Sequence, residues 1–502
     1  MNTDKPFDPH SHPHAKSVLG QIKDKDSSFW KRKGEERALA LFHAAARRVP
    51  AYKDFLAKRK VRVSSIRDFA SLTEVPRTSK KEYVNAYPLK ELAWDGKLDH
   101  PSVFTSTSGS TGEQTYFFRS EIIDWQCSVM QEFFIENGKD PLKPTLVVVC
   151  FGMGIWIGGV ITYEAMTRLG ERGFPISVIT PGINKTEIFK ILRRISPEYH
   201  QTIVFGYPPF IKDLIDEAPG SGVDLKKLRI RFSTAAEAYS EDFRDYIANA
   251  VKVRDPILDI MSIYGSADIG AMAFETPTSI GIRRIARSNR ALFTEMFNST
   301  QKTPTLAQFV PTFINFEQSN GELLLTGNNS IPLVRYAIGD NGGVYSHDEM
   351  KELLRKHGSD LPRSRGDRYS SNGLPFVYVF ERNDFSTTLY GAQIYPEAIR
   401  DVLIKKPFSK ILSGKFTLTT KYDAKHDQYL ELNLELAKDR VANKIFKAQL
   451  SNQIVKNLTL KNSEFKELSK FIGPRAHPRL VFWQHEDPNF FRPGIKQLWV
   501  KK

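Results

Sequence analysis

Short apolar runs alternate with longer helical stretches along the middle of the chain, from about residue 101 onward. The runs at 145–151, 174–180 and 201–207 are nearly continuous and rich in β-branched residues, which is typical of strands buried on both faces. Stretches with helical periodicity follow, for example at 159–173 and 186–196. The alternation continues through LRIRFST, SEDFRDYIANAV and ILDIMSIYG. It predicts an α/β fold built on mostly parallel sheets.

The two ends of the chain differ from the middle. Residues 1–28 are polar and are expected to form a flexible N-terminal tail. A helical pattern begins at Phe29, and the large N-terminal domain is expected to span residues 29–380. From residue 381 to residue 502, a short helix, two alternating strands, a long amphipathic helix and a last strand predict a small, mobile α+β domain. The hinge between the domains is expected near Asp384.

Composition narrows the classes of protein that remain. The chain has 502 residues, 41% of them hydrophobic, which describes an ordinary globular protein of two or more domains. Its two cysteines, Cys127 and Cys150, are too few for a disulfide framework. The first residues have no apolar core after their charges, and no apolar stretch is long enough to span a bilayer, so neither secretion nor a membrane span is expected, and a cytoplasmic protein is expected.

The net charge of +15 favours anionic ligands. Composition does not identify those ligands, and a well-solvated basic surface that binds none of them would give the same net charge. The sequence has no zinc-finger spacing and no aromatic RNA-binding signature, so no nucleic-acid partner is expected.

The segment FTSTSGSTGEQTYFF carries the first candidate chemistry. Glycines let backbone N–H groups converge, and the nearby hydroxyls add donors, an arrangement that suits phosphate oxygens. A Walker loop would end in Lys-Ser or Lys-Thr and lead into a helix, and this segment does neither. Taken alone, the run could equally be a flexible linker. Its residues are Thr107, Ser108, Gly109, Ser110, Thr111 and Gly112.

Several further segments, in the right order, resemble the adenylate-forming enzyme superfamily, and in particular its phenylacetate:coenzyme A ligase-like branch. Upstream of the loop these are ALFHAAARRVPAYKDFL and SLTEVPRTSKKEY, and downstream FGMGIWIGGVITYEAMTRLG and IVFGYPPFIKDL. The resemblance runs from about residue 36 to the C-terminus. It implies that residues 107–112 are the family's phosphate loop, with Thr111 among the catalytic residues.

Two further motifs of the family concern the adenine and a metal ion. The turn Ala235-Ala236-Glu237-Ala238 is similar to a short Gly-Ala-Glu-Pro motif, which implies that Glu237 lies near the adenine; a helix-start carboxylate is the structural alternative. SIYGSADIG resembles a Tyr-Gly-x-Ser/Thr-Glu motif, which implies that Tyr264 and Gly265 lie against the adenine and that Asp268 holds Mg²⁺. Ala267 and Asp268 depart from that motif, since a hydroxyl is missing and the carboxylate is one methylene shorter.

The last three motifs lie in the second half of the chain. IPLVRYAIGDNGG keeps the family pattern intact and implies that Asp340 accepts hydrogen bonds from both ribose hydroxyls; a Gly-Asp turn between strands is the structural alternative. FERNDF resembles the interdomain linker, with Arg382 near the ribose or phosphate. In FFRPGIKQLW, Lys496 is the candidate catalytic lysine, although Ile495 is inserted before it.

Together these resemblances imply an AMP-forming acid–thiol ligase that uses ATP and Mg²⁺. Its small-molecule carboxylic acid would be an aryl or fatty acid, and coenzyme A is the favoured acceptor. A carboxylate–amine ligase and an acyl-protein or carrier-protein synthetase are alternatives that would keep every adenylation motif. A nucleotide-binding homologue that has lost its chemistry is a second alternative, because Ala267, Asp268 and the Gly-Ile-Lys end depart from the family pattern.

Overall fold

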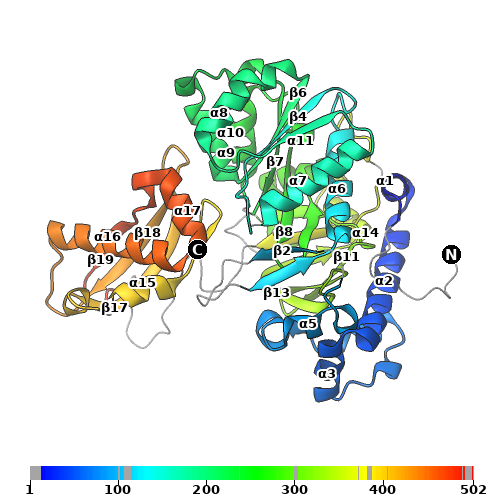
Figure 1. Cartoon of the computed structure of the whole chain (residues 1–502), viewed down its shortest axis with the longest axis horizontal. Coiled ribbons are helices and arrows are strands. Elements are labelled where there is room, and N and C mark those ends of the chain that lie inside the picture. The colour runs from blue at the N-terminus through cyan, green and yellow to red at the C-terminus, as the bar shows by residue number, and fades with distance from the viewer. Residues whose placement is uncertain are drawn as a thin grey trace. The chain divides into compact units, whose positions relative to one another are not determined.

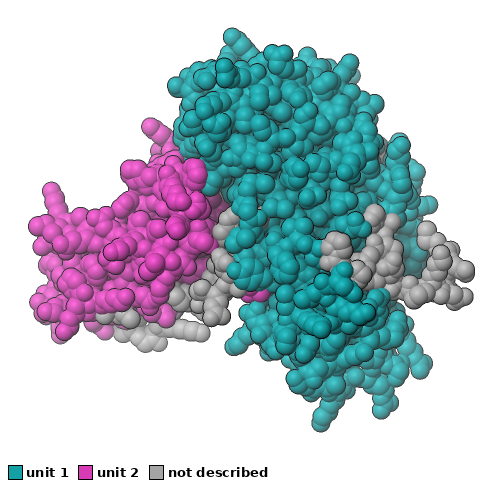
Figure 2. Space-filling view, viewed as in Figure 1, with its two compact units in different colours: residues 1–106, 116–382 teal, residues 107–115, 383–502 magenta. Residues whose placement is uncertain are grey.

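The computed structural model divides into two compact units (Figure 2). The first comprises residues 1–106 and 116–382, and the second comprises residues 107–115 and 383–502. The residues that the structure describes are 13–99, 102–106, 115–155, 157–236, 238–298, 304–370, 372–380, 387–403, 405–488, 490–491 and 500.

The start of the chain corrects one expectation, because residues 13–28 are not a tail. Helix α1 (Ala15–Asp24) buries Ala15, Val18, Leu19 and Ile22, which share one helical face. This apolar face was hard to recognise in the sequence, because it consists of only four residues within a mostly polar segment. Asp26 then caps α2 (Ser27–Arg48) by accepting a hydrogen bond from the Phe29 N–H, and Pro50 begins α3 (Pro50–Lys58).

The middle of the first unit has the predicted alternation of strands and helices. Strands β5, β4, β6, β7 and β8 lie side by side in that order, and every neighbouring pair is parallel. Their bounds are β4 Thr145–Val149, β5 Ile176–Ile179, β6 Gln201–Gly206, β7 Ile230–Ala235 and β8 Ile260–Ser266; the intervening helices are α7 Ile157–Glu171, α8 Lys185–Arg194, α9 Pro208–Glu217, α10 Glu241–Val251 and α11 Pro256–Asp259.

These strands are buried on both faces, which explains their continuous apolar runs. Along β4, Val147 packs in the core beneath α6 (Glu121–Glu136) and α7, whereas Val148 packs in the core beneath α8, α9 and α10. Figure 1 shows these two groups of helices on opposite faces of the strands. The α/β fold class predicted from the sequence is therefore confirmed.

Beyond β8 the same sheet becomes antiparallel, a change that the repeat of strand and helix did not indicate. The order continues from β9 through β10, β14, β13 and β12 to β11, and the short β1 pairs in parallel with β13. Their bounds are β1 Thr78–Ser79, β9 Gly270–Phe274, β10 Thr305–Gln308, β11 Ile314–Ser319, β12 Glu322–Gly327, β13 Leu333–Tyr345 and β14 Phe376–Phe380. The remaining elements of the unit are α4 Phe69–Thr73, α5 Leu89–Leu92, the hairpin β2 Val103–Ser106 and β3 Tyr116–Arg119, α12 Pro277–Ser288, α13 Arg290–Phe297 and α14 His347–Lys356.

The second unit is a small α+β fold with its own apolar core. Its sheet has the order β17-β18-β19, with β17 antiparallel and β19 parallel to the central strand. The predicted long helix is two helices, and Asn462 caps the second by accepting from the Phe465 N–H. The bounds are β15 Thr387–Leu389, β16 Ala392–Ile394, α15 Pro396–Leu403, β17 Leu412–Tyr422, β18 Gln428–Leu436, α16 Lys444–Lys461, α17 Ser463–Ile472 and β19 Arg479–Trp483.

Within these described elements, no helix combines the length and the apolar character that a membrane crossing would require.

Candidate active site

The parallel strands place several candidate residues along one edge of the sheet. Because β4, β6, β7 and β8 run in the same direction, their carboxyl ends lie together, and such an edge is the usual place for a ligand in an open α/β sheet. Phe151 follows β4 and Tyr207 follows β6, and their ring centroids are 5.1 Å apart. Tyr264 and Gly265 lie near the end of β8. This edge therefore gathers aromatic side chains from segments that are far apart in the sequence.

Gly265 lies in the hairpin between β8 and β9, where the backbone leaves no room for a side chain. A Cβ atom at this position would lie 2.8 Å from the Gly270 carbonyl oxygen, and the strand register shifts between Tyr264 and Gly265. The tight hairpin carries Asp268 in its turn, where the Asp268 N–H donates to the Ser266 Oγ at 3.3 Å. The geometry of this hairpin thus requires the glycine of the Tyr-Gly pair.

Asp268 is almost fully buried, with 1% of its surface exposed, and it has a partner for each carboxylate oxygen. The Lys80 Nζ lies 3.2 Å from its Oδ1, and the Tyr336 hydroxyl donates to its Oδ2 at 2.6 Å. The ammonium of Lys80 also lies 5.5 Å from the centre of the Phe117 ring. A buried carboxylate is stabilised when it is paired and hydrogen-bonded in this way.

The pairing of β1 with β13 brings Lys80 to this position. Thr78 and Ser79 are in register with Tyr336 and Ala337, so Lys80, which follows directly, starts next to the Tyr336 strand. Arg335 reinforces the join, because its guanidinium donates to the Val75 carbonyl and pairs with Glu317 at 3.1 Å. Lys80 and Asp268 are 188 residues apart in the sequence. The parallel pairing of β1 with β13 is what brings them together.

Asp340, on β13, meets Tyr264, on β8. The Tyr264 hydroxyl donates to the Asp340 Oδ2 at 2.6 Å, although the two residues are 76 positions apart. The Tyr264 ring stacks on Phe316, with centroids 6.2 Å apart and planes 27° apart. The phenol is therefore held at both its ring and its hydroxyl, and it fixes one oxygen of the Asp340 carboxylate.

A fully buried group of charges holds β8 and the turn after β7. Glu275 accepts from Arg244 and Arg283 at 2.7 Å each, and also from the Ser262 N–H at 2.9 Å. Arg283 in addition donates to the Tyr239 carbonyl at 2.8 Å. Because each removed partner would leave a buried charge uncompensated, the network fixes the backbone on both sides of the candidate site.

The hairpin β2–β3 flanks the predicted phosphate loop. Ser106 and Tyr116 are in register at the end of the hairpin that leads into this loop, and Phe117 of β3 lies beside Lys80. The predicted phosphate loop, residues 107–112, lies outside the described residues. So do Glu237, Arg382, Lys496 and the hinge residue Asp384.

The structure therefore brings together the predicted residues Tyr264, Gly265, Asp268 and Asp340 along one stretch of the sheet. Sequence reasoning missed Lys80 and Tyr336. Tyr336 lies in the same Arg-Tyr-x-x-Gly-Asp pattern as Asp340, so its motif was visible but its role was not. For Lys80 the only local signal is its place in TSKKEY, where a second lysine follows.

The residues present fit Mg²⁺ only in part. Among the described residues no group of three or more His, Cys, Asp or Glu side chains could hold a metal ion. A Mg²⁺ that is bound mainly by nucleotide phosphates and waters needs one or two carboxylates. Asp268 can supply one while keeping Lys80 and Tyr336, because each carboxylate oxygen accepts more than one bond.

The fold as a whole matches the folds of solved structures of a CoA ligase, at low sequence identity. A structure of 2-hydroxyisobutyryl-CoA ligase in complex with 2-HIB-AMP and CoA, in the thioesterification state, matches with a TM-score of 0.62 at 15% identity, over 100% of this chain and 96% of that chain. An open conformation of the same ligase, also with 2-HIB-AMP and CoA, matches with a TM-score of 0.53 at 15% identity, over 100% and 98% of the two chains.

No protein-family model and no curated protein sequence matches the chain. The phenylacetate:coenzyme A ligase-like branch stays a prediction from the motifs.

Proposed function

We propose that this protein activates a carboxylic acid with ATP to give the acyl-AMP, and then transfers the acyl group to a thiol. The observation that carries the proposal is the hydrogen bond from the Tyr264 hydroxyl to Asp340, because it joins two motifs that lie 76 positions apart in the sequence. The fold shared with a ligase whose structures contain an acyl-AMP and CoA supports it.

In the first half-reaction, a substrate carboxylate oxygen would attack the α-phosphorus of ATP. The new P–O bond forms as the bond between the α-phosphorus and the α,β-bridging oxygen breaks, and pyrophosphate leaves with that electron pair. The protein supplies no nucleophile, so its task is to position the reactants and to balance charge. Asp340, oriented by Tyr264, would hold the ribose, while residues 107–112 would hold the phosphates.

Charge balance in this site would come from Lys80, Lys496 and a bound Mg²⁺. Lys80 already lies beside Asp268, next to the hairpin that flanks the phosphate loop. Mg²⁺, when bound, would neutralise charge on the phosphates, with Asp268 as its protein contact. Lys496 would reach the carboxylate and the α-phosphate, and it would be needed for adenylation alone.

In the second half-reaction, the acceptor attacks the acyl carbonyl and AMP leaves. Coenzyme A is the proposed acceptor, and the proposed acid is an aryl or fatty acid that packs against aromatic side chains such as Phe151 and Tyr207. An amine or a carrier protein as acceptor would use the same acyl-AMP. The small domain, residues 381–502, would turn about the hinge near Asp384 between the two steps.

The test is ATP–pyrophosphate exchange with a panel of aryl and fatty acids. Exchange that depends on one class of acid supports the proposal, and adding coenzyme A, an amine or a carrier protein to the active reaction then identifies the acceptor. ATP binding without exchange for any acid would contradict the proposal and would favour the homologue that has lost its chemistry.

A further inference from the structure

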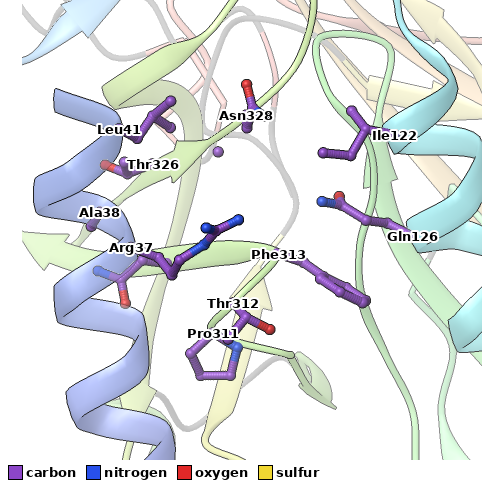
Figure 3. A pocket seen from close by; sticks show the side chains of 12 residues that line it. Arg37, Ala38, Leu41, Ile122, Gln126, Pro311, Thr312, Phe313, Thr326 and Asn328 are labelled. Carbon is purple, nitrogen blue, oxygen red and sulfur yellow. The ribbon is translucent and has the colours of Figure 1, made fainter. Parts of the chain in front are cut away.

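A hollow in the first unit, between α2, α6 and the chain around β11 and β12, has room for about one water molecule (Figure 3). Among the residues that line it, the Oε1 of Gln126 and the Nδ2 of Asn315 are buried without a hydrogen-bond partner in the described part of the chain. One ordered water suits both atoms. The hollow therefore belongs to the packing of the fold, whereas the surface of the same unit has a feature that suits a partner.

The amino ends of the parallel strands form the edge of the sheet that lies opposite the candidate active site. Because β4 to β8 run in the same direction, the turns that lead into them lie together. The His200 N–H donates to the Pro144 carbonyl at 3.1 Å, and the Thr202 N–H donates to the Arg229 carbonyl at 2.9 Å. Turns that are far apart in the sequence therefore share one surface.

A loop from a distant part of the chain joins this edge. The Arg368 N–H donates to the Asn137 Oδ1 at 2.8 Å, and the Asn137 Nδ2 donates to the Asp367 Oδ1 at 3.0 Å. These two bonds hold the loop 363–368 beside the turn 137–144. The arginines of the loop are therefore presented from a fixed backbone.

Lysines and arginines outnumber the acidic residues along this edge. The turns before β4 to β8 and the loop together contain 11 Lys and Arg and six Asp and Glu, so positive charge is in excess. These segments are residues 137–144, 171–175, 196–200, 224–229, 252–255 and 363–368.

The charge of this edge is only partly balanced within the protein. The Asp140 Oδ2 serves three basic side chains, since it lies 3.0 Å from His200, 3.8 Å from Arg254 and 3.9 Å from Arg229. Arg365 and Arg368 are exposed and form no ion pair with any described residue. Six exposed cations of this edge are together called the basic face: Lys139, Lys143, Arg229, Arg254, Arg365 and Arg368.

An exposed leucine lies within the basic face. Leu142 is 72% exposed and stands between Lys139 and Lys143 in one turn. An apolar side chain flanked by cations suits an anionic lipid surface, where the cations meet the headgroups and the apolar group enters between them. A single-stranded nucleic acid would call for aromatic side chains on which bases stack. No large aromatic side chain of the described turns is exposed, so the lipid surface fits better.

We propose that the basic face docks this protein on an anionic lipid surface, with Leu142 inserted among the headgroups. The proposal does not depend on the proposed function, because the face lies at the opposite edge of the sheet from Tyr264 and uses neither ATP nor an acid. Docking in this way leaves the carboxyl ends of the strands, and with them the candidate active site, facing away from the lipid.

The experiment is cosedimentation of the full-length protein with phosphatidylcholine vesicles that contain or lack phosphatidylserine, without nucleotide. We expect binding to the vesicles with phosphatidylserine, and little binding to those without it. The binding should weaken steeply as the salt concentration rises, since exposed charges are screened.

Three variants separate the contributions of charge and apolar insertion. The double variant Arg365→Gln/Arg368→Gln should weaken binding by about 10–30-fold, because each cation near an anionic surface contributes about fivefold. Leu142→Gln should weaken it by about five- to tenfold at every salt concentration. Lys31→Gln/Lys53→Gln, which removes the same charge from exposed positions on α2 and α3, is the matched control and should bind like the wild type.

The melting temperature of each variant shows whether it has folded. Several results would overturn the proposal: no binding of the wild type to vesicles with phosphatidylserine, equal binding to both kinds of vesicle, or equal weakening in the arginine double variant and the lysine control. Tighter binding to a single-stranded RNA than to the vesicles, lost in the same arginine variant, would also overturn it and would assign the basic face to nucleic acid.

Discussion

Tyr264 shows how one side chain can connect two motifs. Its hydroxyl fixes an oxygen of Asp340, and its ring packs on Phe316. If Asp340 holds the ribose, the hydroxyl of Tyr264 acts by orienting that carboxylate before ATP arrives. A positioning role of this kind predicts an effect on ATP binding that exceeds the effect on turnover.

Tyr264→Phe should therefore raise the KM for ATP by about 3–10-fold with a smaller change in kcat, since one charge-assisted hydrogen bond is lost while the ring remains. ATP–pyrophosphate exchange measures both constants. Tyr87→Phe is the matched control, because Tyr87 donates a similar 2.7 Å bond to Asp54 away from the site. An unchanged KM in Tyr264→Phe would contradict the positioning role.

Asp268 combines two roles that a variant can separate. In the structure it is the partner of Lys80 and Tyr336, and in the proposed reaction it also contacts Mg²⁺. Asp268→Asn should raise the Mg²⁺ concentration for half-maximal exchange by about tenfold, because the amide carries no charge. Tyr336→Phe keeps the carboxylate and should leave that concentration nearly unchanged. If both variants needed the same Mg²⁺ concentration, the proposed contact of Asp268 with Mg²⁺ would be contradicted, and the contact with Lys80 would remain.

At the scale of elements, α10 and α12 are joined to the sheet through buried charges. Burial by itself would raise the pKa of Glu241, but Arg244 and Arg283 outweigh it and lower the pKa to about 2. The nitrogens of these arginines lie 2.9 and 2.6 Å from its carboxylate. A carboxyl group whose pKa is lower in the folded state stabilises the fold above its unfolded pKa, and this contribution is lost as the pH falls toward the folded pKa.

Glu241→Gln should therefore lower the free energy of unfolding at neutral pH by about 3 kcal/mol. The difference from the wild type should shrink as the pH falls from about 4.5 toward 2. Urea unfolding followed by tryptophan fluorescence across this range measures it. Glu187→Gln is the control, since Glu187 pairs with Lys190 on the surface and should contribute little at any pH. If the difference in the free energy of unfolding between Glu241→Gln and the wild type did not depend on pH, the stabilising role of the lowered Glu241 pKa would be contradicted.

The hairpin between β8 and β9 requires a glycine at position 270, whereas α1 does not require its glycine at position 20. Gly270 has a φ of +89° and would place a Cβ atom 2.5 Å from Ile123 Cγ2, whereas a Cβ atom on Gly20 of α1 has nothing within 4 Å. Gly270→Ala should lower the free energy of unfolding by about 2–4 kcal/mol through strain and overpacking. Gly20→Ala should raise it by about 0.5–1 kcal/mol through helix propensity. Thermal unfolding of both variants tests this, and a stable Gly270→Ala would refute the close packing.

At the scale of the whole molecule, the proposed reaction uses the second unit differently in its two steps. Lys496 is assigned to adenylation only, so Lys496→Ala should lose exchange by about a hundredfold or more while still converting chemically prepared acyl-AMP. Both half-reactions can be followed by the release of AMP or pyrophosphate. Lys502→Ala, a change at a nearby lysine to which no role is assigned, is the control and should affect neither step. Equal loss of both steps in Lys496→Ala would refute the assignment.

The sequence by itself determined the features that depend on local patterns. Strands such as β4 are buried on both faces and show continuous apolar runs, and α8 and α10 show helical periodicity between strands. These patterns were enough to predict the α/β class. Glycine at position 265 and the carboxylates at 268 and 340 also stand in recognisable order, because the backbone and charge requirements of a site restrict the residue types that can occur there.

Tertiary structure alone decided which side chains meet. Asp268 contacts Lys80 and Tyr336 because a two-residue strand, β1, pairs with β13, and so short a strand leaves no periodic signal. The antiparallel half of the sheet and the burial of α1 were missed for a similar reason, since pairing partners and docking surfaces lie far away in the chain. Periodicity reports how a segment meets its surroundings, whereas the identity of those surroundings is settled only when the chain has folded.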